Sequence, residues 1–162
     1  MARALLQQED VDKLLQSGKL SVSGQYQWKR GSHKSWLKIQ VPVNIEDPKV
    51  TDVNLRIVVS VSLTVLGKRD FSLIWNSTIR VRGLCVSGNH TNRHTNAERW
   101  LRQMHKHKWT DQCLDRFAYT PTDITAEDVQ GQFAQFCAEC GITCSASLAE
   151  LPSTQGGLYN DL

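Results

Sequence analysis

Apolar residues occupy every second position over 53–65, and most of the residues between them are polar. This period of two is typical of a β-strand with one buried face. After a short loop at 67–70 the alternation resumes and continues over 71–81. We therefore predict a long antiparallel hairpin formed by residues 53–66 and 71–86, with its odd-numbered residues buried. The residues expected in the core are Ile57, Val59, Val61, Leu73 and Trp75.

Helical and strand patterns flank this hairpin. Apolar residues on one helical face predict a short helix at 7–16 and a second helix at 125–140. Alternating residues predict strands at 24–30 and 35–43. The fold class is therefore α+β, an antiparallel sheet with the C-terminal helix packed on one face and a short N-terminal helix. We expect a single domain over residues 1–145 and a flexible acidic and polar tail over 146–162.

The segment that follows the hairpin has two possible structures. Residues 89–96 include no apolar residue and are typical of a loop rich in hydrogen-bonding side chains. Residues 97–108 fit a helix, because Asn96 could cap it and Trp100, Leu101 and Met104 have helical spacing. The alternation that begins at His105 fits a strand equally well.

Charge is distributed unevenly along the 162 residues. Residues 1–118 contain all 19 lysines and arginines and have a net charge of +9, whereas residues 119–162 have a net charge of −6. A basic surface of this kind suits an anionic partner. No apolar run is long enough to span a membrane, and residues 1–12 lack the apolar core of a signal peptide. We therefore expect a cytoplasmic protein with reduced thiols and no membrane partner.

Four of the five histidines lie within 18 residues, at His90, His94, His105 and His107. Histidine exchanges a proton near neutral pH and is also the commonest metal ligand. If the segment around His105 is extended, His105 and His107 share a face, roughly 6–7 Å apart along the strand. A neutral ring and a charged ring could then act as base and acid on one phosphate. Residues that could stabilise the developing charge are Arg93, Arg102, Lys106, Lys108 and Tyr119.

Two other interpretations of the histidines remain. His105, His107 and His90 could supply three ligands to zinc, although Glu98, Asp111 and Asp115 are the only nearby acids. The cluster could also be a solvated polar loop. We expect a site that works without a metal or cofactor.

The cysteines and the missing motifs narrow the possibilities. Cys137 and Cys140 share a helical face with Phe133 and Phe136, so we expect them to be buried core thiols without metal. The chain includes no phosphate-binding loop, dinucleotide-binding fingerprint, HExxH or GxSxG motif. We therefore do not expect this protein to be a nucleotide hydrolase, a dehydrogenase, a zincin protease or a common serine hydrolase.

A resemblance follows from the order of the motifs. The chain has His90-Thr91-Asn92, then His105-Lys106-His107, then Phe117-Ala118-Tyr119 before the second helix. Over roughly residues 53–142 it resembles small uncharacterised bacterial and phage proteins with a His-x-Asn and His-x-His signature. More distantly it is similar to the TumE-type toxins of toxin–antitoxin modules. The resemblance implies that His90, Asn92, His105 and His107 form the site.

These observations lead to two functional hypotheses. The first is a nucleic-acid-targeting protein of the toxin or phage–host conflict type that cleaves RNA without a metal. His90, His105 and His107 would be catalytic, and the nucleic-acid-binding residues would be Arg80, Arg82, Arg93, Lys106 and Lys108. The second is a non-enzymatic interaction module, such as an inhibitor or antitoxin-like partner, whose basic face docks on an acidic protein surface.

Overall fold

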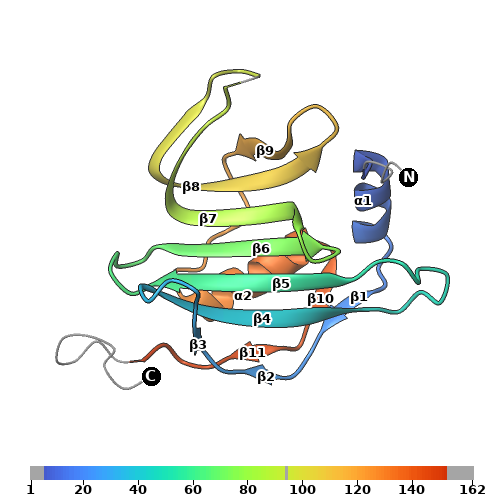
Figure 1. Cartoon of the computed structure of the whole chain (residues 1–162), viewed down its shortest axis with the longest axis horizontal. Coiled ribbons are helices and arrows are strands. Elements are labelled where there is room, and N and C mark those ends of the chain that lie inside the picture. Colours follow the sequence, from blue (N-terminus) through green and yellow to red (C-terminus); the bar gives the residue numbers. More distant parts are fainter. Residues whose placement is uncertain (1–5, 94, 153–162) are drawn as a thin grey trace.

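A nine-stranded sheet forms most of the protein in the computed structural model, which describes residues 6–93 and 95–152 (Figure 1). In chain order the elements are α1 (Gln8–Leu15), β1 (Leu20–Val22), β2 (Gln25–Tyr26), β3 (Lys29–Arg30), β4 (Trp36–Ile45), β5 (Leu55–Ser62), β6 (Arg69–Trp75), β7 (Ile79–Thr91), β8 (Arg99–Thr110), β9 (Leu114–Tyr119), α2 (Val129–Glu139), β10 (Ile142–Cys144) and β11 (Ser147–Leu148). The strand order is β10-β1-β4-β5-β6-β7-β8-β9, and β3 pairs with β4. All pairs in this sheet are antiparallel except β1 with β10. The predicted α+β class is confirmed.

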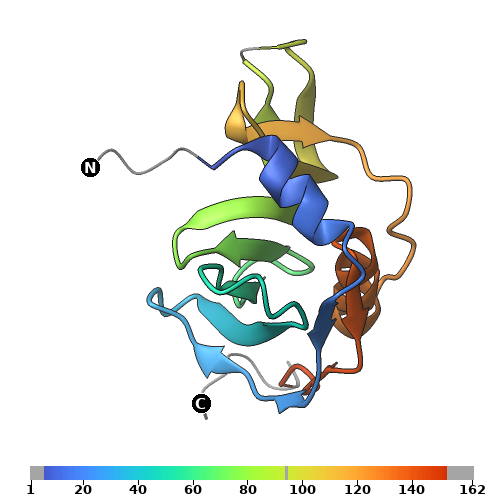
Figure 2. The ribbon, with the colours of Figure 1, turned by 90° about the vertical axis from the view of Figure 1, so that its right-hand side faces the viewer.

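Helix α2 covers one face of the sheet, as Figure 2 shows from the side. The ring centroids of Phe136 on α2 and Phe71 on β6 are 5.9 Å apart. Asp128 caps the helix by accepting a hydrogen bond from the Gly131 N–H, which satisfies one of the unpaired donors of the first turn. The helix ends at Glu139, and Gly141 follows its C-cap with a positive φ of 67° and a close approach to Leu15 of α1 that leaves no room for a side chain.

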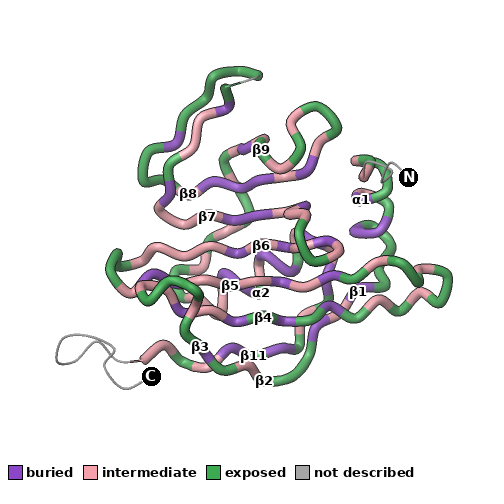
Figure 3. Tube along the Cα trace, viewed as in Figure 1, coloured by how far each residue is buried: buried purple, intermediate pink, exposed green. Residues whose placement is uncertain are grey.

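The core follows the predicted alternation. Ile57, Val59 and Leu73 are completely buried, and Val61 and Trp75 are nearly so. Figure 3 shows buried segments along the central strands of the sheet. Cys137 and Cys140 are also buried in this core, as expected, and both are free thiols. Each large apolar side chain buried here contributes about 1.5–3 kcal/mol to folding, so the central strands and α2 form the rigid support of the molecule.

The prediction of one continuous strand over residues 71–86 is wrong. It divides into β6 and β7 at a tight turn, in which Asn76 and Ser77 have positive φ values of 45° and 74°. The Asn76 side chain accepts a hydrogen bond from the Asn54 N–H and holds the turn against the start of β5. The turn has three residues and Trp75 pairs with Ile79, so the apolar residues keep their odd numbers and the alternation conceals the turn.

The expected boundary of the tail at residue 145 is also corrected. Ser147 and Leu148 pair with β2, and the indole of Trp28 donates a hydrogen bond to the carbonyl of Ala149. Residues 146–149 are therefore part of the packed fold, and residues 153–162 lie outside the described residues. Within the described ranges, neither helix has the length and apolarity needed to cross a membrane.

Candidate active site

Three histidine rings meet on the face of the sheet opposite α2. The ring centroids of His90 and His107 are 4.8 Å apart, those of His105 and His107 are 4.9 Å apart, and those of His90 and His105 are 5.7 Å apart. His105 and His107 are buried, whereas His90 is half-buried. We call these three residues the histidine cluster. His94, the fourth histidine of the sequence cluster, lies outside the described residues.

Two of the rings meet because the segment that contains them is a strand. Residues Arg99–Thr110 form β8, so the helical alternative for 97–108 is wrong. His105 pairs with Cys85 and His107 pairs with Gly83 of β7, which places both rings on the same side of the sheet. The expected sharing of a face by His105 and His107 is confirmed.

The third ring is brought in by a bend in the β7–β8 hairpin, whose two strands turn sharply out of the sheet in Figure 1. The pairing register shifts on both sides of Gly88, and Ser87 and Arg102 have positive φ values of 65° and 51°. Such β-bulges bend a strand and re-aim its side chains. A Cβ on Gly88 would overlap the Sγ of Cys85 and press on the His105 ring, so only glycine fits here. The bend places His90 against His105 and His107.

Hydrogen bonds orient two of the rings. Nδ1 of His105 lies 3.0 Å from the carbonyl oxygen of Gln103, and because a carbonyl only accepts, Nδ1 carries the proton. Nε2 of His90 lies 3.1 Å from Oδ1 of Asn92. The amide of Asn92 is itself fixed, since Oδ1 accepts from the Ala118 N–H and Nδ2 donates to the Ala118 carbonyl. His90 therefore donates from Nε2, and the remaining nitrogens, Nδ1 of His90 and Nε2 of His105, have no hydrogen-bond partner among the described residues.

His107 packs against the other two rings and lies beside Arg80. Its Nδ1 is buried without a hydrogen-bond partner among the described residues. Burial lowers the pKa of His107 to about 3, and the positive charge of Arg80 and the two other histidines add to this effect. Burial also lowers the pKa of His105, against the hydrogen bond to Gln103. Burial is therefore the main cause of both shifts in pKa, and nearby positive charge adds to it. The expected charged ring is not provided by His107, which is neutral at pH 7.

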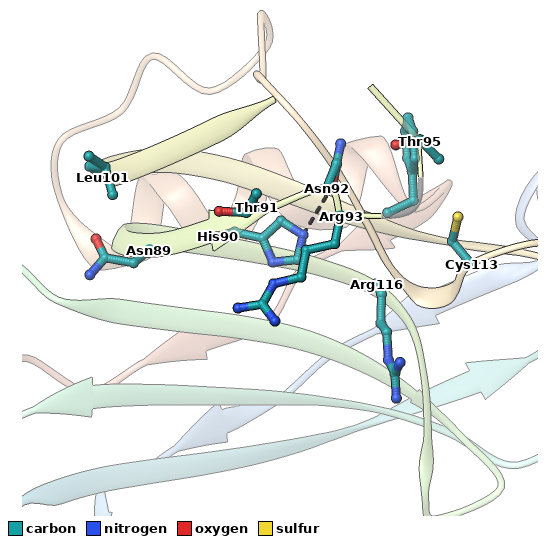
Figure 4. A pocket seen from close by; sticks show the side chains of 10 residues that line it. Asn89, His90, Thr91, Asn92, Arg93, Thr95, Leu101, Cys113 and Arg116 are labelled. Atoms are coloured by element: carbon teal, nitrogen blue, oxygen red, sulfur yellow. Dashed lines mark hydrogen bonds between the residues drawn. The ribbon is translucent and has the colours of Figure 1, made fainter. Parts of the chain in front are cut away.

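A cavity of about 490 Å³ lies beside the cluster, and His90 is the cluster member that lines it (Figure 4). Arg93 and Arg116 also line this cavity, with Asn and Thr side chains and with Phe117. No acidic residue is among the described residues of the lining. The cavity therefore combines two cations with neutral hydrogen-bonding groups, which is a suitable environment for an anion.

The predicted nucleic-acid-binding residues divide between the two faces of the sheet. Arg93 lies at the cavity, and Arg80 packs beside His107 and Gly83 while bonding to Asp115. Arg82 lies on the opposite face with Asp12 and Glu139, because a β-bulge inserts Val81 between the residues paired with Leu73 and Ile74. Arg80 and Arg82, both expected to bind nucleic acid, therefore lie on opposite faces of the sheet and cannot belong to one basic surface.

Lys106 and Lys108 also lie on the helix side, because residues of a strand alternate between faces. Lys106 is only 1% exposed, and its Nζ binds both carboxylate oxygens of Asp123 at 2.7 Å, with Glu139 3.9 Å away. The Nζ of Lys108 lies over the ring of Tyr119, whose hydroxyl bonds to Glu139. Lys106, Lys108 and Tyr119 therefore belong to the packing between the sheet and α2 and do not face the histidine cluster.

One residue of the site escaped the sequence patterns. Arg116 reaches the cavity because β9 pairs with β8 through residues such as Ala118 and His107. It is an isolated basic residue in a short turn and strand, so nothing local marks it as part of a site.

No family model, curated protein or solved structure matches this chain, so the geometry of the site is the basis for a functional argument.

Proposed function

We propose that the cavity beside the histidine cluster binds a nucleic acid, with RNA as the expected substrate, and that the cluster promotes cleavage of a phosphodiester bond there. The observation that carries this proposal is the convergence of His90, His105 and His107 next to a cavity lined by Arg93 and Arg116. A protein that acts in this way is compatible with the toxin or phage–host conflict type expected from the motif order.

The two arginines supply the affinity for phosphate in this proposal. Neither the Arg93 nor the Arg116 guanidinium forms a hydrogen bond or ion pair with another described residue. Free guanidinium groups bind phosphate oxygens through two parallel N–H donors. Arg99 and Arg102 on the exposed tip of the β7–β8 hairpin extend this positive surface along a bound strand.

The chemistry that suits the cluster is activation of an oxygen nucleophile. In RNA the 2′-hydroxyl gives up its proton to a neutral imidazole of the histidine cluster, O2′ forms a bond to phosphorus, and the bond from phosphorus to O5′ breaks. The proton then passes to the leaving O5′, so the step needs no other reactant. Arg93 and Arg116 would stabilise the charge that develops on the phosphate oxygens.

Labelled single-stranded RNA, incubated with the purified full chain, tests the proposal. We expect His90→Ala and His107→Gln each to reduce cleavage by about 10²–10⁴-fold, as for loss of a proton-transferring group. His33→Ala is the matched control, because His33 lies in an exposed turn far along the chain from the cluster. Cleavage that survives both cluster substitutions in folded protein would contradict the proposal, as would its absence from the unmodified protein.

A specific observation favours the interaction module as a second candidate. Leu101 is 59% exposed at the hairpin tip, between Arg99 and Arg102. An exposed apolar residue between two cations suits docking on an acidic protein surface. Reversal of Arg99 and Arg102 to Glu tests it, since these side chains are exposed, whereas reversal of Arg82 would break its ion pairs with Asp12 and Glu139.

A further inference from the structure

We propose that His90, His105 and His107 bind one divalent transition-metal ion of the zinc class. One ring nitrogen from each residue lies within 4.8 Å of the others, and no thiol or carboxylate of the described residues joins this group. The catalytic consequence rests on the proposed function, but the binding of the metal does not.

The rings need only a small adjustment to reach a metal. Zinc–nitrogen bonds of about 2.0–2.1 Å in a tetrahedral site place the ligand nitrogens about 3.3 Å apart. The separations of up to 4.8 Å must therefore contract by about 1.5 Å. His105 and His107 are fixed to one strand face, so the half-buried His90 on the bent hairpin is the ring with freedom to move toward them.

The second ring nitrogens are held as they are in known metal sites. Metal-bound histidine almost always donates its other N–H to a carbonyl or carboxylate, which fixes the tautomer and the ring orientation. Nδ1 of His105 donates to the Gln103 carbonyl, and Nε2 of His90 donates to the amide oxygen of Asn92. These bonds direct the lone pairs of Nε2 of His105 and Nδ1 of His90 away from the protein partners.

His107 provides an independent reason for a ligand. Its side chain is buried to more than nine-tenths, and Nδ1 has no hydrogen-bond partner among the described residues. An unpaired buried polar atom costs about 1–3 kcal/mol, so natural proteins rarely retain one without a reason. Coordination of a metal through Nδ1 would supply the partner that this atom lacks, and the backbone of Asp115 is the other polar group beside the ring.

The donor set selects the type of metal. Three imidazole nitrogens suit zinc, copper, nickel and cobalt, whereas magnesium and calcium prefer oxygen donors. Three protein ligands also leave a coordination position for water or substrate, as in catalytic zinc sites. Since His90 lines the cavity with Arg93 and Arg116, this position suits a phosphate oxygen, and the metal would supply Lewis-acid activation of the nucleophile.

Metal titration of the chelator-treated full chain tests this inference directly. We expect zinc to bind in a ratio of one ion per chain by calorimetry, and cobalt to give the visible spectrum of a tetrahedral nitrogen site. His90→Ala and His107→Ala should each weaken binding at least about 100-fold. His33→Ala should bind as the unmodified protein does, and circular dichroism should show that all variants are folded. Absence of a one-to-one complex, or unchanged affinity in folded His90→Ala, would overturn the inference.

Activity measurements separate this inference from the proposed function. If the metal binds with the expected dependence on the histidines and RNA is not cleaved, the metal site stands and the cleavage proposal fails. If RNA is cleaved equally well by chelator-treated protein that binds no zinc, the cleavage proposal stands and the metal site fails. Loss of cleavage on chelation, restored by zinc, supports both.

Discussion

At the scale of single residues, the site depends on side chains that hold others in place. Asn92 is 97% buried by its packing and connects His90 to the backbone of Ala118 on β9 through three hydrogen bonds. Asn92 acts as a positioning residue. Its amide bonds to the N–H and the carbonyl of Ala118, as a neighbouring strand would, and its Oδ1 also fixes the tautomer of His90. The motif order had already implied Asn92, and the structure supplies its physical role.

Substitution of Asn92 by alanine should impair the site in a measurable way. The His90 ring would lose its acceptor and Ala118 its partners, so we expect zinc affinity to fall about 10–100-fold. The free energy of unfolding should fall by about 1–3 kcal/mol, because the Ala118 groups remain buried without partners. Calorimetric titration and urea unfolding measure these two effects, and Gln40→Ala, at an exposed position of β4, is the control. Unchanged zinc affinity would show that Asn92 does not position His90.

The buried neutral state of His107 predicts how stability depends on pH. The pKa of His107 is about 3 in the folded protein against 6.5 in an ordinary environment. Between these values the unfolded chain binds the extra proton, so the metal-free protein loses stability as the pH falls from 6.5 toward 3. Across this window each pH unit should cost up to ~1.4 kcal/mol more in the unmodified protein than in His107→Gln. Urea unfolding of both proteins with a chelator measures the difference, and parallel pH profiles would contradict it.

At the scale of elements, the bend in the β7–β8 hairpin creates the site. The inner part of this hairpin belongs to the flat sheet, whereas the outer part beyond Gly88 turns back over the histidine face. Two register shifts and the left-handed residues Ser87 and Arg102 accompany the bend. A regular hairpin of the same sequence would place His90 farther along the strand from His105 and would separate the rings.

Gly88→Ala should disrupt the bend without replacing a histidine. The added methyl group would overlap Sγ of Cys85 and lie 3.2 Å from the His105 ring, so either the Cys85 side chain or β7 must shift beside the cluster. We expect zinc affinity to decrease about 10–100-fold, comparable with loss of an orienting partner. The double variant Gly88→Ala, Cys85→Ala removes the overlapping sulfur and should recover a large part of the affinity. Equal loss in the single and double variants would contradict this explanation.

At the scale of the whole molecule, a network of charged groups centred on the buried Lys106 connects the sheet to α2. Lys106 on β8 binds Asp123, and both Lys106 and Arg82 approach Glu139 on α2. Tyr119 donates to the same Glu139 carboxylate. These groups lie beneath the histidine cluster, on the other side of the same strands, so they stabilise the support of the site rather than binding its ligand.

We therefore expect Lys106→Ala to lower the free energy of unfolding without changing the binding of an anion in the cavity. Removal of the lysine leaves the largely buried Glu139 with fewer partners, whereas the Asp123 side chain is 48% exposed and becomes solvated, so we expect a loss of about 1–3 kcal/mol in the free energy of unfolding. Lys106→Met retains the apolar stem and should cost less. In folded protein neither substitution should change RNA affinity, whereas Arg116→Ala should weaken it and reduce its salt dependence. Loss of RNA affinity in folded Lys106→Met would restore a direct role for Lys106.

Much of the fold was predictable because its causes are local. The alternation of β5 and β6 marks Ile57, Val59 and Leu73 as core residues, and the structure buries all three. The apolar face of α2 follows from helical spacing in the same way. Burial of apolar surface drives both patterns, and a period of 2 or 3.6 residues can be read from neighbouring positions alone.

The sequence alone determined the α+β class, the buried faces of the central strands and the set of histidines that form the cluster. Only the tertiary structure decided on which face each basic residue lies and which rings meet. Arg80 and Arg82 are two residues apart yet lie on opposite faces, because the bulge at Val81 reverses the alternation. His90 reaches His107 because β7 bends at Gly88. Bulges and bends depend on register with a partner strand, a long-range property that no local period encodes.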